Sequence, residues 1–290
     1  MTQPMRKVAL HSVPRSGSTW LGEIFNSSPE VLYRYQPLFS YAFKGQLDPH
    51  SSAEEIDRFF REIAESDDEF VLQRAKRETG VLPAFDKTRP ECVVYKEVRY
   101  HHILENMLAV TDDVKVVGLV RNPLSVINSW LRAPREFRGD LGWKEDEEWR
   151  RAPKKNQGRP EEFAGFEKWV ETAGLFLDLA AEHPRRFRLV EYGDLLARPL
   201  SVVEELFDWV GLHLHPQTKA FLAESRERTV DDPYSVYRGE PTDRAWQEQL
   251  DPGIAEAIVR SVAGTRLEPL LGMTNDELEE WIRPHRGARP

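Results

Sequence analysis

The sequence has few of the features that mark disulfide-stabilised, secreted or membrane-spanning proteins. Its 290 residues include a single cysteine, Cys92, so an intramolecular disulfide is excluded. No apolar run reaches the roughly 18 residues expected of a membrane-spanning helix. The opening residues 1–7 lead directly into an apolar strand, without the apolar core of a signal peptide. We therefore expect no membrane span and a cytoplasmic location.

An excess of positive charge is also absent. The chain carries 40 Lys and Arg against 49 Asp and Glu, a formal net charge of −9. Long polyanions such as DNA or heparin usually select a basic surface. We therefore expect no nucleic-acid partner, whereas a small anion could still bind to local basic residues.

The chain shows no internal repeat and no low-complexity tract, and 40% of its residues are hydrophobic. Apolar strands alternate with helical patterns, which predicts one α/β domain over residues 1–290. The segment 132–160 is rich in charge, Pro, Gly and Trp and lacks a clean period, so we expect an excursion or lid there. Capping boxes predict helix starts at Ser52/Glu55, Ser66/Glu69 and Thr274/Glu277.

The N-terminal region has the layout of a phosphate-binding loop. A short apolar strand from Lys7 leads into the turn Arg15-Ser16-Gly17-Ser18-Thr19, and an amphipathic helix starts near Ser18. Gly17 allows a close backbone approach, and free N–H groups and the helix dipole favour an anion there. The turn lacks the first Gly and the Lys of the Walker loop, which disfavours an ordinary ATPase or GTPase. A turn that merely starts a helix is the alternative.

A second motif follows about a hundred residues later. The apolar run from Val116 to Val120 is typical of a central parallel strand buried on both faces, and it ends at Arg121. Asn122 is a good N-cap and Pro123 fits the first position of a helix ending at Leu131. Ser125 and Ser129 then lie on one helix face near Arg121, which predicts a second anion site.

The two motifs in this order resemble those of sulfotransferases that use 3′-phosphoadenosine 5′-phosphosulfate (PAPS), especially the carbohydrate and tyrosylprotein branches. Two further segments fit the same resemblance, Cys92 to Arg99 and Phe187 to Asp194 followed by the helix Pro199 to Val210. The resemblance implies a three-layer P-loop NTPase-like fold with a central parallel sheet flanked by helices. We interpret the Tyr192-x-Asp194 turn as scaffold.

The resemblance also implies which residues bind PAPS, the co-substrate. Arg121 and Ser129 match the Arg and the Ser, eight residues apart, that bind its 3′-phosphate. The 5′-phosphosulfate is assigned to the N-terminal loop, and the full PAPS-binding set is Arg15, Ser16, Gly17, Ser18, Thr19, Trp20, Arg121, Ser129 and Arg238. Sulfuryl transfer resembles phosphoryl transfer, in which positioned cations and backbone donors stabilise a charge-spread transition state. In this chain, Arg15 and either Lys96 or Lys44 would be the cations that stabilise the transition state.

The general base departs from the family pattern. Relatives carry a Glu in the segment after the first helix, and Gln36 stands at the matching position. A neutral amide cannot accept the proton of an acceptor hydroxyl. Glu97, which follows Lys96, is our first candidate, and the others are His102, His101 and Glu23. The scheme needs no metal, and no His/Cys/Asp cluster with ligand spacing is evident in the sequence.

The sequence does not define the acceptor beyond a small molecule with a hydroxyl group, carbohydrate, phenolic or other, and it leaves the oligomeric state unknown. An aromatic segment with two cations could line the acceptor pocket or pack in the core: Tyr33, Arg34, Tyr35, Phe39, Tyr41, Phe43 and Lys44. Two alternative functions stay open. One is an atypical P-loop kinase or NTPase, and the other is a non-catalytic nucleotide-binding protein, which Gln36 would favour.

Overall fold

The structure, a computed structural model, describes residues 5–230, 235–237 and 243–282. At its centre is a five-stranded sheet of order β2-β3-β1-β4-β5 in which every neighbouring pair is parallel. The strands are β1 (Arg6–Ser12), β2 (Val31–Tyr35), β3 (Cys92–Glu97), β4 (Val114–Val120) and β5 (Phe187–Glu191). β3 is buried along its whole length, as expected for a parallel strand covered on both faces.

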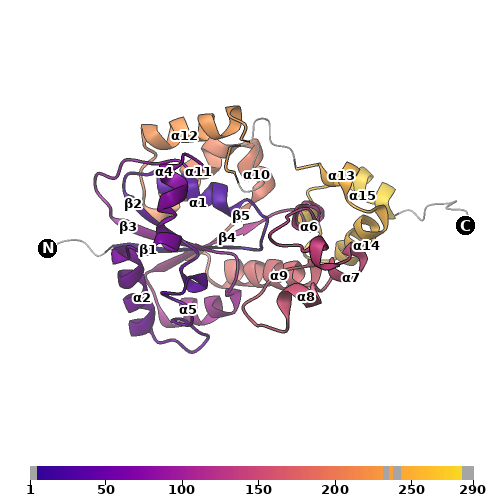
Figure 1. Cartoon of the computed structure of the whole chain (residues 1–290), viewed down its shortest axis with the longest axis horizontal. Helices are drawn as coiled ribbons and strands as arrows, with labels where there is room; N and C mark the ends of the chain where they lie inside the picture. The colour runs from indigo at the N-terminus through magenta and orange to yellow at the C-terminus, as the bar shows by residue number, and fades with distance from the viewer. Residues whose placement is uncertain (1–4, 231–234, 238–242, 283–290) are drawn as a thin grey trace, which may run out of the picture.

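Helices cover both faces of the sheet, giving three layers (Figure 1). One face carries α1 (Ser18–Ser27), α10 (Tyr192–Ala197), α11 (Pro199–Val210) and α12 (Pro216–Glu227). The other carries α2 (Ala53–Glu65), α5 (Leu104–Val110), α6 (Pro123–Leu131), α9 (Phe166–Glu182) and α14 (Pro252–Val262). The shorter helices are α3 (Glu69–Leu72), α4 (Arg74–Glu78), α7 (Glu145–Glu148), α8 (Pro153–Asn156), α13 (Trp246–Gln249) and α15 (Asn275–Ile282).

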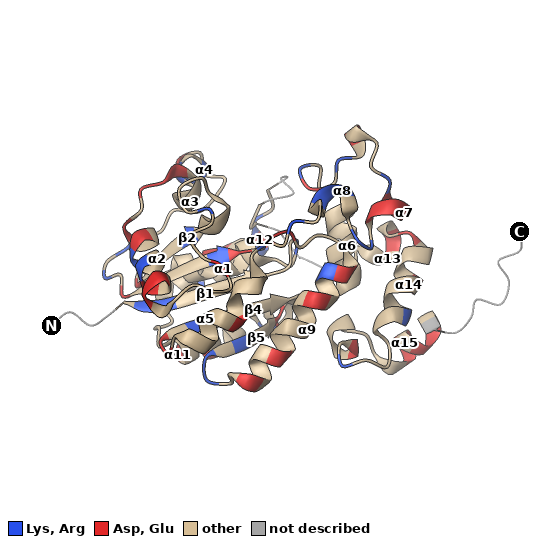
Figure 2. Ribbon diagram, turned by 90° about the horizontal axis from the view of Figure 1, so that it is seen from below, with Lys and Arg blue, Asp and Glu red and all other residues tan. Residues whose placement is uncertain are grey.

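The sheet, with β1 at its centre, separates the hydrophobic core into two parts, one on each face. Its side chains alternate, so Val8 and Leu10 pack toward α1 while Ala9 packs toward α2 and α5. Charged residues lie mainly outside this core. Figure 2 shows acidic residues on α7 and α9, whereas the strands are mostly uncharged. The three-layer parallel architecture expected from the sequence is confirmed.

Because all strands are parallel, their carboxyl ends meet at one edge of the sheet. β1 is central. β2 and β3 lie on one side of it, and β4 and β5 lie on the other. Such a switch point opens a crevice at the carboxyl edge, where open α/β sheets bind ligands. The loop after β1 and the residues that follow β2, β3, β4 and β5 all lie at this edge.

The segment 132–160 forms an ordered excursion of short helices, η3 (Gly139–Leu141), α7 and α8. Aromatic contacts hold it on the core: Phe137 packs edge-on against Trp130 of α6, and Trp149 packs on Phe166 of α9. That this segment acts as a lid stays a prediction. That residues 1–290 form one domain also stays a prediction. Among the described residues, no helix combines the length and the apolarity needed to cross a membrane.

Candidate active site

The loop between β1 and α1 has a backbone shaped for close approach. Gly17, the N-cap of α1, has a φ of 85°, and Arg15 has a φ of 69°, an uncommon value for a residue with a side chain. Holding a non-glycine residue there costs about 1–3 kcal/mol, and such strain clusters at functional sites. The hydroxyls of Ser12 and Ser16 are buried and have no hydrogen-bond partner within the described part of the chain. Buried donors without partners next to a helix N-terminus fit an anionic ligand.

Gly17 is also required by its surroundings. A Cβ placed on it would lie 2.4 Å from Cε2 of Tyr192, far closer than a real contact allows. Tyr192 opens α10 at the end of β5, and its ring packs edge-on against Trp20 at 6.3 Å between centroids. The indole N–H of Trp20 donates to Oγ of Ser225 on α12 at 3.0 Å. The loop, Trp20 and Tyr192 therefore form one packed unit.

The second motif meets this loop directly. Nε of Arg15 donates to Oγ of Ser129 on α6 at 3.1 Å, and Nη1 of Arg121 donates to the carbonyl oxygen of Arg15 at 2.9 Å. The guanidinium of Arg121 also lies over the Tyr192 ring, 4.7 Å from its centroid. Asn122 caps α6 through its Oδ1, which accepts from the amide of Leu124, as predicted. Two motifs separated by 106 residues in sequence thus form one basic, donor-rich site.

A carboxylate of the chain contacts Arg121 in this structure. Nε of Arg121 donates to Oδ1 of Asp243 at 2.6 Å, and Oγ of Ser125 donates to the Asp243 carbonyl oxygen at 2.8 Å. Both charged side chains are less than one-fifth exposed. Asp243 therefore binds the cation that the sequence assigns to a phosphate.

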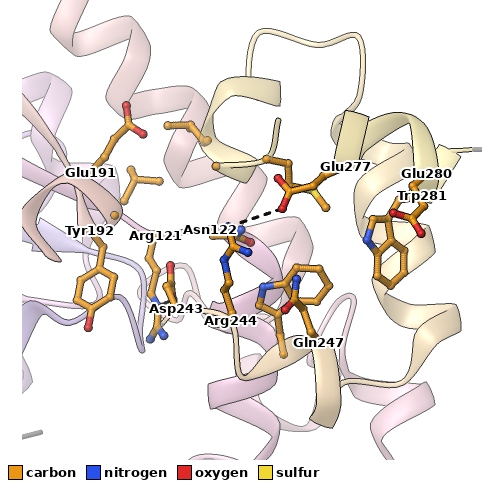
Figure 3. A pocket seen from close by; sticks show the side chains of 16 residues that line it. Arg121, Asn122, Glu191, Tyr192, Asp243, Arg244, Gln247, Glu277, Glu280 and Trp281 are labelled. Carbon is orange, nitrogen blue, oxygen red and sulfur yellow. Dashed lines mark hydrogen bonds and ion pairs between the residues drawn. The ribbon is translucent and has the colours of Figure 1, made fainter. Parts of the chain in front are cut away.

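A pocket of about 290 Å³ opens beside this ion pair (Figure 3). Arg121 and Tyr192 lie on one side of it, and Glu277 and Trp281 of α15 lie on the other. Arg244, paired with Glu277 at 3.6 Å, lies between the two sides.

The end of β3 supplies the two predicted catalytic groups. Lys96 and Glu97 are both buried, and Nζ of Lys96 lies 4.3 Å from the centroid of the Tyr35 ring. Burial lowers the pKa of Lys96, with the carboxylate of Glu97 opposing that shift. Burial raises the pKa of Glu97, and Lys96 opposes that shift in turn. Oε1 of Glu97 accepts the amide N–H of Leu38 at 2.8 Å, whereas its Oε2 is buried without a hydrogen-bond partner among the described residues. One oxygen is thus anchored and the other can accept a proton.

Gln36 lies on the neighbouring strand end. Its backbone N–H donates to the carbonyl oxygen of Lys96 at 2.8 Å, and its Oε1 accepts from Nη1 of Arg99 at 3.3 Å. Arg99 also pairs with Glu162 at 3.0 Å, which ties the end of β3 to the chain just after the excursion. Gln36 is therefore adjacent to Glu97, although it has no basic group itself.

The other candidate bases have different surroundings. Glu23 is buried against Arg77, with Nη2 to Oε1 at 2.8 Å, so its charge is already compensated. His101 is buried, and its Nδ1 lies 3.1 Å from Nδ1 of His11. His102 is half-buried near Tyr100, and burial lowers its pKa. Lys44 is exposed.

The aromatic segment after β2 divides between core and surface. Tyr33 and Phe43 are buried in the core, and Arg34 binds the carbonyl oxygens of Ile63 and Ala64 at the end of α2. Phe39 is 45% exposed and lies against Phe70 and under the Arg99 guanidinium, 4.1 Å from it. Only part of the segment is therefore available to a ligand.

The site geometry agrees with the comparisons with known proteins. A family model described as "Sulfotransferase domain" matches residues 5–235. The chain belongs to this family. This member of the sulfotransferase family is 23% identical over 296 residues to carbohydrate sulfotransferase 3 of Mus musculus, covering 80% of the chain and 61% of the mouse protein. The human protein of the same name is 22% identical over 287 residues, with 79% and 58% covered. The chain thus spans about three fifths of the length of these relatives.

Solved sulfotransferase-family structures share the fold. The crystal structure of mouse sulfotransferase SULT7A1 complexed with PAP superposes with a TM-score of 0.52, at 12% identity over 92% of this chain and 88% of the other. Retinol dehydratase in complex with androsterone and inactive cofactor PAP gives 0.54, at 18% identity over 91% and 83%. The expected P-loop NTPase-like fold is confirmed.

The structure brings together most of the residues that the sequence predicts for the site and adds two that it does not. Arg15, Ser16, Gly17, Ser18, Thr19, Trp20, Arg121 and Ser129 come together as one cluster, while Lys96 and Glu97 end the adjacent strand β3 and His102 follows it. Arg238 lies outside the described residues. Tyr192 was interpreted as scaffold and Asp243 was not singled out. The collision expected at Gly17 reveals the role of Tyr192, and no sequence motif marks Asp243.

Proposed function

We propose that this chain transfers the sulfuryl group of PAPS to the hydroxyl group of a small acceptor by in-line displacement. The observation that carries the proposal is the joining of the two anion-binding motifs, through the Arg15–Ser129 and Arg121–Arg15 hydrogen bonds. PAPS carries phosphate groups on both sides of its ribose and therefore needs two anion sites at one sheet edge. The PAP named in two structures of similar fold supports the same ligand class.

The substrate would bind across the centre of the carboxyl edge. The 5′-phosphosulfate would receive backbone N–H groups from Ser16 to Thr19 and the guanidinium of Arg15. The 3′-phosphate would pair with Arg121 and Ser129 once Asp243 releases the guanidinium. Trp20 and Tyr192 would contact the purine ring. Participation of Arg238 stays a prediction.

The transfer forms a bond between the acceptor oxygen and sulfur and breaks the bond from sulfur to the 5′-phosphate oxygen. The acceptor proton moves to Glu97, and 3′-phosphoadenosine 5′-phosphate departs with the bonding electron pair. Lys96 would balance the charge that develops on the leaving oxygen. The unpaired Oε2 of Glu97 supports its role as base, because that oxygen is buried next to Lys96 and has no competing donor among the described residues.

The phosphotransferase alternative has less support. A P-loop kinase or NTPase places a Mg²⁺-binding carboxylate at the end of a central strand, and β4 is followed by Arg121 instead. The non-catalytic alternative rests on Gln36, and the adjacent carboxylate of Glu97 weakens it. That the reaction needs no metal, that no nucleic acid binds and that the protein is cytoplasmic stay predictions. The oligomeric state remains undefined.

The decisive experiment compares nucleotides by thermal shift and then measures turnover. 3′-Phosphoadenosine 5′-phosphate in hundredfold excess over its Kd should stabilise the fold by about 3 kcal/mol, and ATP by much less because it lacks a 3′-phosphate. Radiolabelled PAPS should then label acceptors in a panel of sugars and phenols. Arg15→Ala should reduce turnover on the order of a hundredfold, whereas Arg89→Ala, at an 83% exposed side chain, is the matched control. Equal shifts with both nucleotides would contradict the proposal.

A further inference from the structure

Three metal-ligating side chains meet at the amino-terminal edge of the sheet, opposite the phosphate loop. Glu30 immediately precedes β2, and His213 and His215 lie in the connection between α11 and α12. Their ligand atoms all lie within 4.8 Å of one another. The proposed sulfuryl transfer uses none of the three.

Two of the three distances within the cluster are short enough for a shared ion. Nδ1 of His213 lies 2.8 Å from Oε1 of Glu30, and Nε2 of His215 lies 3.5 Å from the same oxygen. The backbone N–H of His213 donates to Oε2 of Glu30 at 3.0 Å, which fixes the carboxylate. Nε2 of His215 is buried, and its contact with Glu30 at 3.5 Å does not satisfy hydrogen-bond geometry. A buried ring nitrogen without a partner is costly unless a ligand satisfies it.

The donor set identifies the class of ligand. Zn²⁺ binds imidazole nitrogen and carboxylate oxygen at about 2.0–2.2 Å, so two of its ligand atoms can lie no more than about 4 Å apart. Two imidazoles with one carboxylate suit zinc-class ions, whereas Mg²⁺ and Ca²⁺ prefer oxygen ligands. The nearby cation Arg6 is already paired with Glu91, at 3.5 Å.

We propose that Glu30, His213 and His215 bind one divalent transition-metal ion of the zinc class. His213 has an 80% exposed side chain, so solvent can complete the coordination sphere. The ion would link the start of β2 to the connection that leads into α12. Because α12 carries Ser225, the acceptor for the Trp20 indole, the ion would stabilise the helix that supports the phosphate loop from behind.

The proposal is tested on the full chain after treatment with EDTA and dialysis. Titration with ZnCl₂ in a calorimeter should give one ion per chain and raise the melting temperature, while MgCl₂ should give neither. CoCl₂ should give visible absorption bands typical of nitrogen and oxygen coordination. Each of His213→Ala and Glu30→Gln should weaken zinc binding at least tenfold, a loss on the scale seen when metal-site residues are replaced. His50→Ala, an exposed histidine outside the cluster, should bind zinc as the wild type does.

Stabilisation by 3′-phosphoadenosine 5′-phosphate is measured on the same samples. The His213→Ala chain should retain that stabilisation, which shows that it is folded and keeps the nucleotide site independent of the metal site. Absence of stoichiometric zinc in the wild type, or unchanged zinc affinity in the His213→Ala/His215→Ala double variant, would overturn the metal proposal. Neither result would bear on sulfuryl transfer.

Discussion

Among single residues, Asp243 bears most directly on the proposed nucleotide site, because its carboxylate binds Nε of Arg121 at 2.6 Å. A phosphate that binds Arg121 must displace this carboxylate. Asp243→Asn removes the competing charge while keeping the side-chain size. We expect the Kd for 3′-phosphoadenosine 5′-phosphate to fall about tenfold, equivalent to about 1.4 kcal/mol of the binding free energy. Isothermal titration calorimetry measures it.

Asp208→Asn provides the control, since it makes the same substitution at an exposed position of α11. This variant should leave the Kd unchanged. A higher Kd in Asp243→Asn, meaning weaker nucleotide binding, would show that Asp243 orients Arg121 for the phosphate instead of competing with it.

Glu97 is the residue that tests the proposed chemistry. Glu97→Gln keeps an oxygen that can accept the Leu38 amide N–H but loses basicity. Turnover should fall about a hundredfold while nucleotide affinity stays within about twofold of wild type, because general-base catalysis contributes about 10²–10⁴. Because burial raises the pKa of Glu97 and lowers that of Lys96, wild-type turnover should rise with pH as Glu97 loses its proton and fall again as Lys96 loses its own, and the variant should lose the rising limb.

Two further variants separate Glu97 from its competitors. Gln36→Glu places a carboxylate on the adjacent strand end and should restore part of the turnover in the Glu97→Gln background. His102→Ala should have a mild effect if Glu97 is the base. Full turnover in Glu97→Gln would remove Glu97 from the mechanism.

At the scale of elements, the junction of β1, loop and α1 depends on one glycine. Gly17→Ala introduces a Cβ that collides with Tyr192 and forces an L side chain to a φ of 85°. We expect a loss of unfolding free energy of about 2–4 kcal/mol, combining the positive-φ cost with displacement of a buried ring. Urea unfolding measures the loss, and nucleotide-induced stabilisation should disappear with it.

Gly45→Ala isolates the conformational part of that cost. Gly45 has a φ of 75°, and a Cβ there meets no atom within 4 Å. Its loss should be about 1 kcal/mol. Equal losses of unfolding free energy in Gly17→Ala and Gly45→Ala would show that the Tyr192 ring can move aside without an energetic cost.

Elements defined by local signals could be predicted from the sequence. α6 and α11 begin and end where Pro at the first turn and the apolar period placed them. The capping boxes at Ser52 and Thr274 are present, but the helix expected after Ser66 is capped by Asp68, whose side chain accepts from Val71. Ser66 instead accepts the Asp68 amide. Ser66 and Asp68 are both good N-cap residues and lie two positions apart. The local sequence does not indicate which of them caps the helix.

The parts of the site that could not be predicted depend on tertiary packing. Asp243 reaches Arg121 across 122 residues, and His213 reaches Glu30 across 183. No periodicity or spacing relates such distant positions. His213-Leu214-His215 is a local signal of the proposed metal site, and two histidines without their carboxylate do not define a site.

At the scale of the whole molecule, buried histidines should make stability depend on pH. His11 is fully buried and bonded to His101 and Tyr95, and burial lowers its pKa to about 3. The pKa of His101 is lowered too. Below pH 6.5 the unfolded chain binds protons that the folded chain excludes. Each such histidine should therefore lower the free energy of unfolding by about 1.4 kcal/mol per pH unit as the pH drops from 6.5 to 5, whereas Glu97, whose raised pKa acts in the opposite direction, offsets part of this fall.

Urea unfolding at several pH values checks this expectation. His11→Gln should reduce the slope by one proton, even if the variant is less stable at every pH. His50→Ala, at an exposed site, should leave the slope unchanged. An unchanged slope in His11→Gln would contradict the neutral buried state of that ring.

The strand order also has a consequence for biosynthesis. β1 pairs only with β3 and β4, and Arg6 is in register with Cys92, so the first strand stays without a partner until more than 80 further residues have been made. β2 must likewise wait for β3, since β3 is its only neighbour among the described strands. Sheets of such remote pairings fold slowly, with their apolar strands transiently open to other chains. During synthesis, the emergence of β3 from the ribosome is therefore the event that first allows any part of this sheet to form.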